Sequence, residues 1–124
     1  MKLFSVEEAN ALIPELRPKL LSIQRLYANV DILKDDARAA ASASQFGGGM
    51  TGGTSYVNML YQIGKLTTEI AELGVEMKDY TLGLIDFPHM RNGRVVLLCW
   101  QLGEGDELEW WHETEAGFAG RQRL

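Results

Sequence analysis

A glycine-rich interruption between two helical patterns constrains the fold of this chain more than any other feature of its sequence. Glycines crowd residues 46–53 and end any helix that precedes them, because glycine favours turns and weakens helices. Before them, apolar side chains step by four and three positions, the spacing of a helix face that packs on another helix. These residues are Leu16, Leu20, Ile23, Tyr27 and Val30.

A second helix is predicted after the interruption, over residues 54–73. Its apolar stripe consists of Leu60, Ile63, Leu66, Ile70 and Leu73. Gly74 then ends the helix, in the role that glycine commonly takes there. We expect the two helices to form an antiparallel hairpin with arms of about 30 Å. A turn near Met50 places residues 54–73 beside roughly residues 26–45.

The first helix begins with a capping signal. Ser5 and Glu8 have the S-x-x-E spacing in which each side chain bonds the other residue's backbone amide. Proline removes an amide donor and disfavours helical geometry in the residue before it. A helical arm over residues 6–45 is therefore predicted to break near Pro14, as a kink or as a fresh helix start. Residues 6–25 extend past the open end of the hairpin, so the rest of the chain must cover their apolar seam.

This cover is predicted to be an antiparallel β-meander over residues 74–113, where short apolar runs alternate with turn residues. An edge strand is expected near residues 75–77, and a second strand over residues 82–87 that Pro88 ends. Residues 95–102 are apolar on both faces, which is typical of a central strand. Asn-Gly and Gly-Glu-Gly-Asp segments supply the turns between these runs.

The last run, residues 107–113, alternates between an apolar side that includes Leu108 and Trp110 and a mostly acidic side that includes Trp111. Trp111 is therefore expected to be partly exposed. Residues 114–124 show neither a helical nor a strand pattern. The predicted fold class is α+β, a long antiparallel helical hairpin packed on a small three- to four-stranded antiparallel β-meander.

Length and charge bound the class of protein. At 124 residues the chain fits one domain, and its net charge of −5 disfavours nucleic acid and anionic membranes, which bind clustered Lys and Arg. No stretch has the apolar length of a membrane span or the form of a signal peptide. Cys99 is the only cysteine, so no intrachain disulfide can form. We therefore expect a cytoplasmic protein.

The glycine-rich segment contains a G-x-G-x-x-G spacing at Gly47, Gly49 and Gly52. A dinucleotide site needs a strand before this motif, and a helix precedes it here, so a hairpin tip is the favoured interpretation. Nucleophilic catalysis also has little support. Cys99 lies in an apolar run typical of a buried cysteine, and the sequence has no G-x-S-x-G turn. No catalytic residue is assigned.

Both histidines lie near carboxylates. Asp86 precedes His89 by three positions, and His112 is followed by Glu113. Imidazoles and carboxylates together bind zinc, iron or manganese. The two segments each end a strand of one small sheet, so a divalent-metal site from these four residues is a hypothesis. Their spacing matches no fixed metal motif, and the favoured interpretation of His112 is a core or interface histidine with one hydrogen-bond partner.

A small-ligand site beside the sheet is a related hypothesis. It combines Asp86, Arg91, Glu113 and Arg121 with Trp111 as an apolar wall. A guanidinium can hold an anionic ligand through two parallel hydrogen bonds. For Arg121, however, a structural ion pair with a carboxylate such as Asp86 or Glu113 is the favoured interpretation.

Four segments resemble motifs of one bacterial family. Residues 4–16 (FSVEEANALIPEL) look like its opening, and residues 83–88 (GLIDFP), 98–104 (LCWQLGE) and 111–122 (WHETEAGFAGRQ) are similar to its later motifs. The family is the uncharacterised "domain of unknown function 2203". The resemblance spans nearly the whole chain; it implies a small stand-alone bacterial protein and supplies no activity. Arg123 departs from the pattern, which has proline there.

Together these features favour a non-enzymatic interaction or oligomerisation module. Two wide apolar stripes exceed what a sheet of this size can cover, so a homodimer through the helical hairpin is expected. The alternative is a small-ligand or divalent-metal site, which requires at least three polar side chains to converge on one cleft. Those side chains are Asp86, His89, His112, Glu113 and Arg121.

Overall fold

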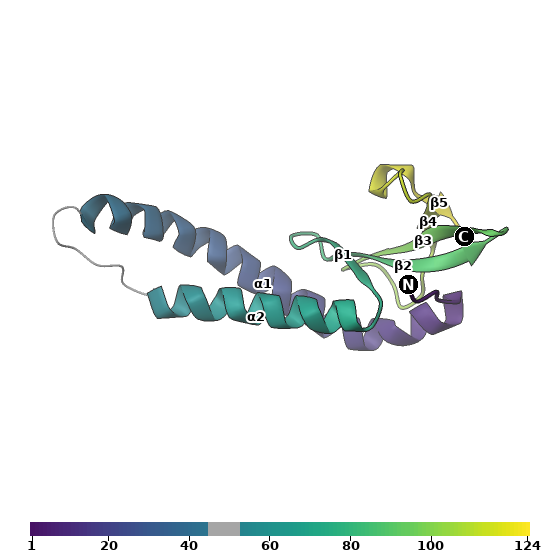
Figure 1. Cartoon of the computed structure of the whole chain (residues 1–124), viewed down its shortest axis with the longest axis horizontal. Coiled ribbons are helices and arrows are strands. Elements are labelled where there is room, and N and C mark those ends of the chain that lie inside the picture. The colour runs from purple at the N-terminus through teal and green to yellow at the C-terminus, as the bar shows by residue number, and fades with distance from the viewer. Residues whose placement is uncertain (45–52) are drawn as a thin grey trace.

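The structure of the protein is a computed structural model that describes residues 1–44 and 53–124. Its helices are α1 (Val6–Ser44) and α2 (Gly53–Glu72), with a short 3-10 helix η1 (Phe118–Gly120). Its strands are β1 (Glu76–Asp79), β2 (Leu84–Arg91), β3 (Arg94–Gln101), β4 (Trp110–His112) and β5 (Gln122–Arg123). Figure 1 shows the two long helices side by side, with the sheet at one end of the pair. The predicted α+β class, with a helical hairpin and an antiparallel sheet, is confirmed.

The helix α1 begins at the expected capping box. The amide of Ser5 donates to Glu8 Oε1 at 2.9 Å, and the amide of Glu8 donates to Ser5 Oγ at 3.0 Å. Two amides that have no partner within the helix are thereby satisfied. The hydrogen bonds from Ser5 also lower the pKa of Glu8, because they favour its ionised form.

Of the two alternatives for the predicted break near Pro14, the fresh helix start is wrong, because α1 runs through both Pro14 and Pro18 without interruption. The kink stays a prediction. Both rings lie on the exposed side of the helix. Proline has no amide hydrogen to donate. The carbonyls of Asn10 and Pro14 therefore lack the helical hydrogen bonds that residues 14 and 18 would otherwise donate to them. On the opposite side, Ile13 and other core residues are fully buried. Packing of that buried side outweighs the two lost hydrogen bonds.

The hairpin forms, but its two arms are shifted from the expected pairing. With the expected turn near Met50, Glu69 would lie beside residue 31. In the structure, Glu69 lies beside Lys19 instead, and Glu69 Oε2 accepts a hydrogen bond from Lys19 Nζ at 2.9 Å. Figure 1 shows α1 ending beyond the start of α2. The core near Ile70 sets this register, since Ile70 is fully buried in one cluster with residues from the first half of α1. The glycine-rich hairpin tip, apart from Gly53, lies outside the described residues.

Gly74 ends α2 as predicted. Its φ of 89° is one that few residues other than glycine adopt. The amide of Gly74 donates to the carbonyl of Ala71 at 2.9 Å, and the amide of Val75 donates to that of Ile70 at 3.4 Å. This Schellman arrangement closes the helix and directs the chain into β1.

The sheet is a meander of five strands, whereas three to four were predicted. Each strand pairs antiparallel with the next, in the order β1-β2-β3-β4-β5. The central position of β3 and the edge position of β1 are both as predicted. Asn92 and Gly93, with φ of 50° and 79°, form the two-residue turn between β2 and β3. Positive φ at both positions is typical of a type I′ hairpin turn, which fixes the register of the two strands.

The predicted end of the second strand at Pro88 is wrong, because β2 continues to Arg91. The carbonyl of Pro88 accepts a hydrogen bond from the amide of Phe4 at 2.7 Å, so its backbone polar groups point away from β3. The pairing of β1 with β2 ends at Asp86. Pro88 therefore lies on the edge of β2 beyond the end of its pairing with β1, where its missing amide costs the sheet no hydrogen bond.

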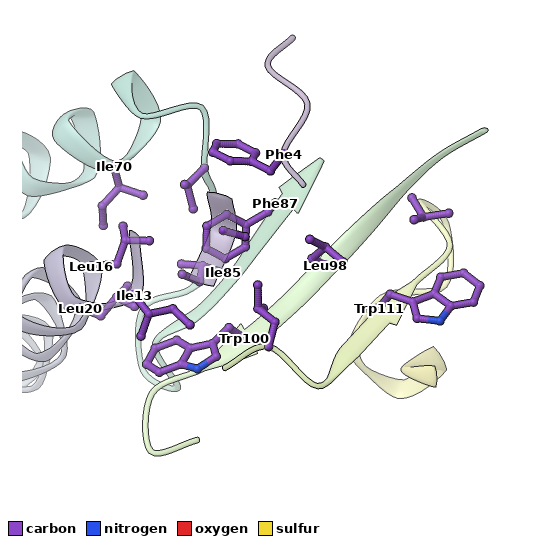
Figure 2. Packing of buried hydrophobic residues seen from close by; sticks show 14 of the residues in the cluster. Phe4, Ile13, Leu16, Leu20, Ile70, Ile85, Phe87, Leu98, Trp100 and Trp111 are labelled. Carbon is purple, nitrogen blue, oxygen red and sulfur yellow. The ribbon is translucent and has the colours of Figure 1, made fainter. Parts of the chain in front are cut away.

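The sheet covers the first half of α1, as the uncovered seam predicts. Figure 2 shows Ile13, Leu16 and Leu20 of α1 and Ile70 of α2 packed with residues of β2 and β3. The strands contribute side chains of one sheet face, which are Ile85, Phe87, Val96, Leu98 and Trp100. The β1–β2 turn adds a second contact, since the Tyr80 ring stacks on Tyr27 with centroids 5.5 Å apart.

The expected exposure of Trp111 is wrong. Trp111 is only 6 % exposed and belongs to the core, whereas Trp110 is half-buried. Trp111 pairs directly with Leu98 and so points to the helix side of the sheet. The alternation fails because β4 has only three residues. Leu108 lies in the irregular loop before β4 and reaches the same core from there. The amide of Leu108 donates to Asn10 Oδ1 at 2.7 Å, which holds the loop against α1.

The C-terminal segment also differs from the prediction that it has no regular structure. It contains η1 and the two-residue strand β5, which pairs with Trp110 and Trp111. The amide of Leu124 donates to the carbonyl of Glu109 at 2.9 Å. A strand of two residues is too short to show a period in sequence, so tertiary pairing alone reveals it.

Candidate functional site

Asp86, Cys99 and His112 converge on the sheet face that points away from the helices. They come from β2, β3 and β4; Asp86 pairs directly with Cys99, and His112 pairs with the neighbouring Leu97. Their potential ligand atoms, a carboxylate oxygen, Sγ and an imidazole nitrogen, all lie within 4.8 Å of one another. All three residues are buried, at 2 %, 1 % and 2 % exposure.

Both ring nitrogens of His112 face oxygen atoms. Nδ1 lies 2.7 Å from the carbonyl oxygen of Glu113, which can only accept, so Nδ1 donates there. Nε2 lies 3.1 Å from Asp86 Oδ2. A neutral imidazole carries one N–H. The second contact therefore needs a further proton, either on the ring or on the Asp86 carboxyl.

The carboxyl of Asp86 is in an unfavourable environment for a charge. Burial raises its pKa, and the opposing effect of His112 is smaller. Its second oxygen, Oδ1, is buried and has no hydrogen-bond partner among the described residues. The Cys99 thiol, a weak donor, offsets only part of the burial of this carboxyl. A buried carboxylate oxygen without a partner forfeits its hydration, which is destabilising.

Cys99 is a poor nucleophile in this setting. Burial, followed by the nearby charge of Asp86, raises the pKa of its thiol to about 12. A reactive cysteine needs the opposite, a lowered pKa and access to solvent. The geometry therefore does not favour a cysteine–histidine catalytic pair.

Arg121 lies beside this cluster. Its guanidinium forms hydrogen bonds of 2.8 Å to both carboxylate oxygens of Glu104 and lies 3.5 Å from the carbonyl oxygen of Cys99. The ring centroids of Trp110 and Phe118 lie 5.0 and 4.7 Å from the same group. The structure thus places Arg121 in a structural ion pair, with Glu104 in place of Asp86 or Glu113.

Two of the four hypothetical metal ligands lie apart from the cluster. His89 pairs with Val96 on the helix side of the sheet, and its Nδ1 lies 2.6 Å from the carbonyl oxygen of Phe4. The side chain of Glu113 forms an ion pair with Arg94, which lowers the pKa of that carboxyl. Of the four, only Asp86 and His112 bring side chains together.

Two of the hypothetical ligand-binding residues, Arg91 and Trp111, lie on the helix side of the sheet, away from Asp86. Arg91 lies over the ring of Trp111, with the guanidinium carbon 4.5 Å from the ring centroid. Trp111 itself faces the helices, opposite to Asp86. Arg91 and Trp111 therefore form a cation–π contact at the margin of the hydrophobic core.

Sequence reasoning missed Cys99 as a member of the cluster, although a signal was present. A two-residue turn at Asn92 and Gly93 makes residue 185 − i the partner of residue i, since 92 + 93 = 185. Asp86 then pairs with residue 99. The turn chemistry and this arithmetic together were enough to place Cys99 beside Asp86.

A second feature lies on the outward side of α2. We define the outer face of α2 as Val57, Leu60, Tyr61, Gly64, Lys65, Thr68 and Glu72. Val57, Leu60 and Tyr61 are 61 %, 45 % and 71 % exposed. A hollow of ≈ 550 Å³ lies there, lined by residues of α2 that include Leu60, Tyr61 and Gly64. A Cβ placed on Gly64 would have no atom within 4 Å, so the backbone is open to a close approach.

The fold and the buried cluster define a small α+β protein, a helical hairpin on a five-stranded antiparallel meander. The family model described as "Uncharacterized conserved protein (DUF2203)" matches residues 2–124. The chain belongs to this family, which confirms the resemblance seen in its motifs. No curated protein and no solved structure matches the chain. Among the described residues, no helix has the length and apolar character to cross a membrane.

Proposed function

We propose that the protein is a non-enzymatic interaction module that self-associates through the outer face of α2. The observation that carries this proposal is the exposure of Val57, Leu60 and Tyr61, three large apolar side chains within two helical turns. Single exposed apolar residues are ordinary, whereas a contiguous group of them beside a hollow is typical of an interaction site.

The contrast between the two ends of the hairpin supports this proposal. Near the sheet, Ile13, Leu16 and Ile70 are fully buried. Farther from the sheet, Leu60 and Tyr61 remain in water. Burial of an exposed leucine side chain contributes roughly 1.5–3 kcal/mol. A partner that covers this part of α2 therefore gains more apolar burial than one that binds the hairpin near the sheet, where Ile13, Leu16 and Ile70 are already buried.

A second copy of the chain suits this face. In a two-fold interface each copy presents the same patch, so the patch must complement itself. An antiparallel crossing centred between Leu60 and Tyr61 sets each Leu60 opposite Tyr61 of the second copy, so exposed apolar side chains meet across the two-fold axis. It also sets each Val57 opposite Gly64, where the lack of a side chain lets the two backbones approach.

Self-association is tested by sedimentation equilibrium of the full chain and of a Leu60→Glu variant. Wild type is expected to be a dimer, and Leu60→Glu is expected to weaken association at least about tenfold, because it buries an unpaired charge among apolar groups. Met90→Glu is the matched control: Met90 is 47 % exposed, like Leu60, but lies on β2. It is expected to leave association unchanged.

Two results contradict this proposal. One is a wild-type chain that stays monomeric at its highest soluble concentration. The other is equal weakening by Met90→Glu and Leu60→Glu, which assigns the association to general surface hydrophobicity instead of the outer face of α2.

We further propose a cytoplasmic location. The support is the sequence itself, which has a single cysteine and therefore gains nothing from an oxidising compartment. The small-ligand alternative has weaker support than self-association. Its basic and acidic members Arg91, Glu113 and Arg121 already contact Trp111, Arg94 and Glu104 within the chain.

A further inference from the structure

We propose that Asp86, Cys99 and His112 bind one divalent metal ion, Zn²⁺, through a carboxylate oxygen, Sγ and Nε2. This site goes beyond the proposed self-association and uses different residues. It rests on the arrangement of three potential ligand atoms, on an unpaired buried oxygen, and on the hydrogen bonds of the His112 ring.

The spacing of the three ligand atoms fits a small ion. Zinc bonds of about 2.0–2.3 Å in tetrahedral geometry set ligand atoms about 3.3–3.6 Å apart. His112 Nε2 lies 3.1 Å from Asp86 Oδ2, and no separation within the cluster exceeds 4.8 Å. Side-chain shifts of at most roughly 1 Å therefore bring the three atoms to coordinating distance.

The backbone positions of the three ligands are rigid. Asp86, Cys99 and His112 lie on β2, β3 and β4, which are hydrogen-bonded neighbours in the sheet. Ligands on strands keep their places without the entropy cost of ordering a loop. The site is thus preformed by the sheet, before any ion arrives.

A cation also removes the two deficits that the cluster otherwise carries. If the carboxylate of Asp86 binds the ion through both oxygens, Oδ1, which is buried without a partner among the described residues, gains a ligand bond. His112 Nδ1 donates to the carbonyl of Glu113 at 2.7 Å, which leaves Nε2 free to offer its lone pair. Metal-bound histidines commonly have such a backbone acceptor on the other ring nitrogen, because it fixes the tautomer and the ring orientation.

The mixture of donors selects the metal. Thiolate, imidazole and carboxylate together are typical of Zn²⁺, whereas Mg²⁺ and Ca²⁺ prefer oxygen alone. The charges of the thiolate and the carboxylate balance those of the ion, so the buried site carries no net charge. Three protein ligands leave a fourth position for a solvent molecule.

The rival interpretation is a structural histidine–aspartate pair beside a buried thiol. The two interpretations differ in whether sulfur bonds to an added metal, so the spectrum of the Co²⁺-substituted protein separates them. Full-length protein without an affinity tag is stripped with a chelator and titrated with Co²⁺ and then Zn²⁺. We expect about one ion per chain and a thiolate-to-cobalt charge-transfer band in the near ultraviolet.

Two ligand variants and one control complete the experiment. Cys99→Ser is expected to lose the charge-transfer band, and Cys99→Ser and Asp86→Asn are each expected to weaken Zn²⁺ binding by more than about 100-fold, since loss of an outer-shell contact alone costs 10–100-fold. His89→Gln is the matched control, because it removes the other histidine from the opposite face of the sheet. It is expected to keep both the band and the affinity.

The wild-type protein alone can overturn the proposal, so the test holds even if a ligand variant fails to fold. A chain that binds no Co²⁺, or binds it without a sulfur band, excludes a site that includes Cys99. Equal loss of affinity in His89→Gln and in Cys99→Ser, with circular dichroism unchanged in both, assigns the binding to exposed groups elsewhere.

Discussion

Gly83 shows how one residue fixes the path of the chain into β2. Its φ is 64°, in the left-handed region that glycine adopts without strain. A Cβ at this position would lie 2.7 Å from Leu102 Cβ, which is too close for any stable contact. The carbonyl of Gly83 also accepts from the amide of Leu102 at 3.0 Å. The close approach of these two segments therefore requires glycine.

We predict that Gly83→Ala destabilises the fold by about 2–4 kcal/mol, from the left-handed backbone and the clash together. Gly93→Ala is the control: its φ is 79°, but a Cβ there meets no atom within 4 Å. It should cost only about 1–2 kcal/mol. Urea denaturation of both variants measures the difference, and equal losses would show that Leu102 moves aside freely.

The buried cluster was partly predictable residue by residue. From the sequence, Asp86 and His112 are identifiable as a carboxylate and an imidazole near the predicted ends of two strands. His89 has the same chemistry in the same strand as Asp86, yet it contacts the carbonyl of Phe4. An odd separation along a strand sends two side chains to opposite faces, and three positions separate Asp86 from His89. The period of the strand therefore decides which histidine can reach Asp86.

At the scale of the element, α1 shows that packing can override a helix breaker. Pro14 and Pro18 are four positions apart and share the exposed side of the helix. The opposite side contributes Ala9, Ile13 and Leu16, all fully buried. A proline on the wet side loses a backbone hydrogen bond but displaces no core side chain, so the helix persists.

Replacement of Pro14 by alanine is expected to stabilise the protein by about 1–2 kcal/mol. Alanine restores the amide that bonds the carbonyl of Asn10, and it is about 3 kcal/mol more favourable than proline in a helix interior. The unfolded chain of the alanine variant has more conformational freedom, which reduces this stabilisation by about 1 kcal/mol. Thermal unfolding followed by circular dichroism measures the change. A lower melting temperature would indicate that the sheet packs only on a helix shaped by Pro14.

The strand β4 shows where pattern reasoning fails. A period of two predicts the exposed face only while the chain stays in a strand, and β4 has three residues. The run from Leu108 to Trp111 combines an irregular loop with a short strand, so both ends reach the core. A strand this short takes its orientation from its neighbour β3.

At the scale of the whole molecule, the two proposed sites lie on different elements. The outer face of α2 belongs to the hairpin, and the Asp86–Cys99–His112 cluster belongs to the sheet face away from the helices. Figure 1 shows the hairpin extending from one end of the sheet. No residue is common to both sites, which leaves no direct contact to couple them.

We therefore predict that metal binding and self-association are independent. Leu60→Glu should keep the Zn²⁺ affinity of wild type, and Cys99→Ser should keep its dimerisation constant. Coupling between two binding events is reciprocal, so each measurement checks the other. A tenfold change in either quantity would show that the hairpin and the sheet communicate through their shared core.

The sequence by itself determined the local elements of this protein, because capping, turn chemistry and apolar period are properties of neighbouring residues. The capping box at Ser5, the type I′ turn at Asn92 and the helix end at Gly74 are of this kind. Only the tertiary structure decided the shift between the hairpin arms, the path of β2 through Pro88 and the burial of Trp111. These three features depend on contacts between side chains that are distant in the sequence. The packing of the whole core determines which of those contacts form.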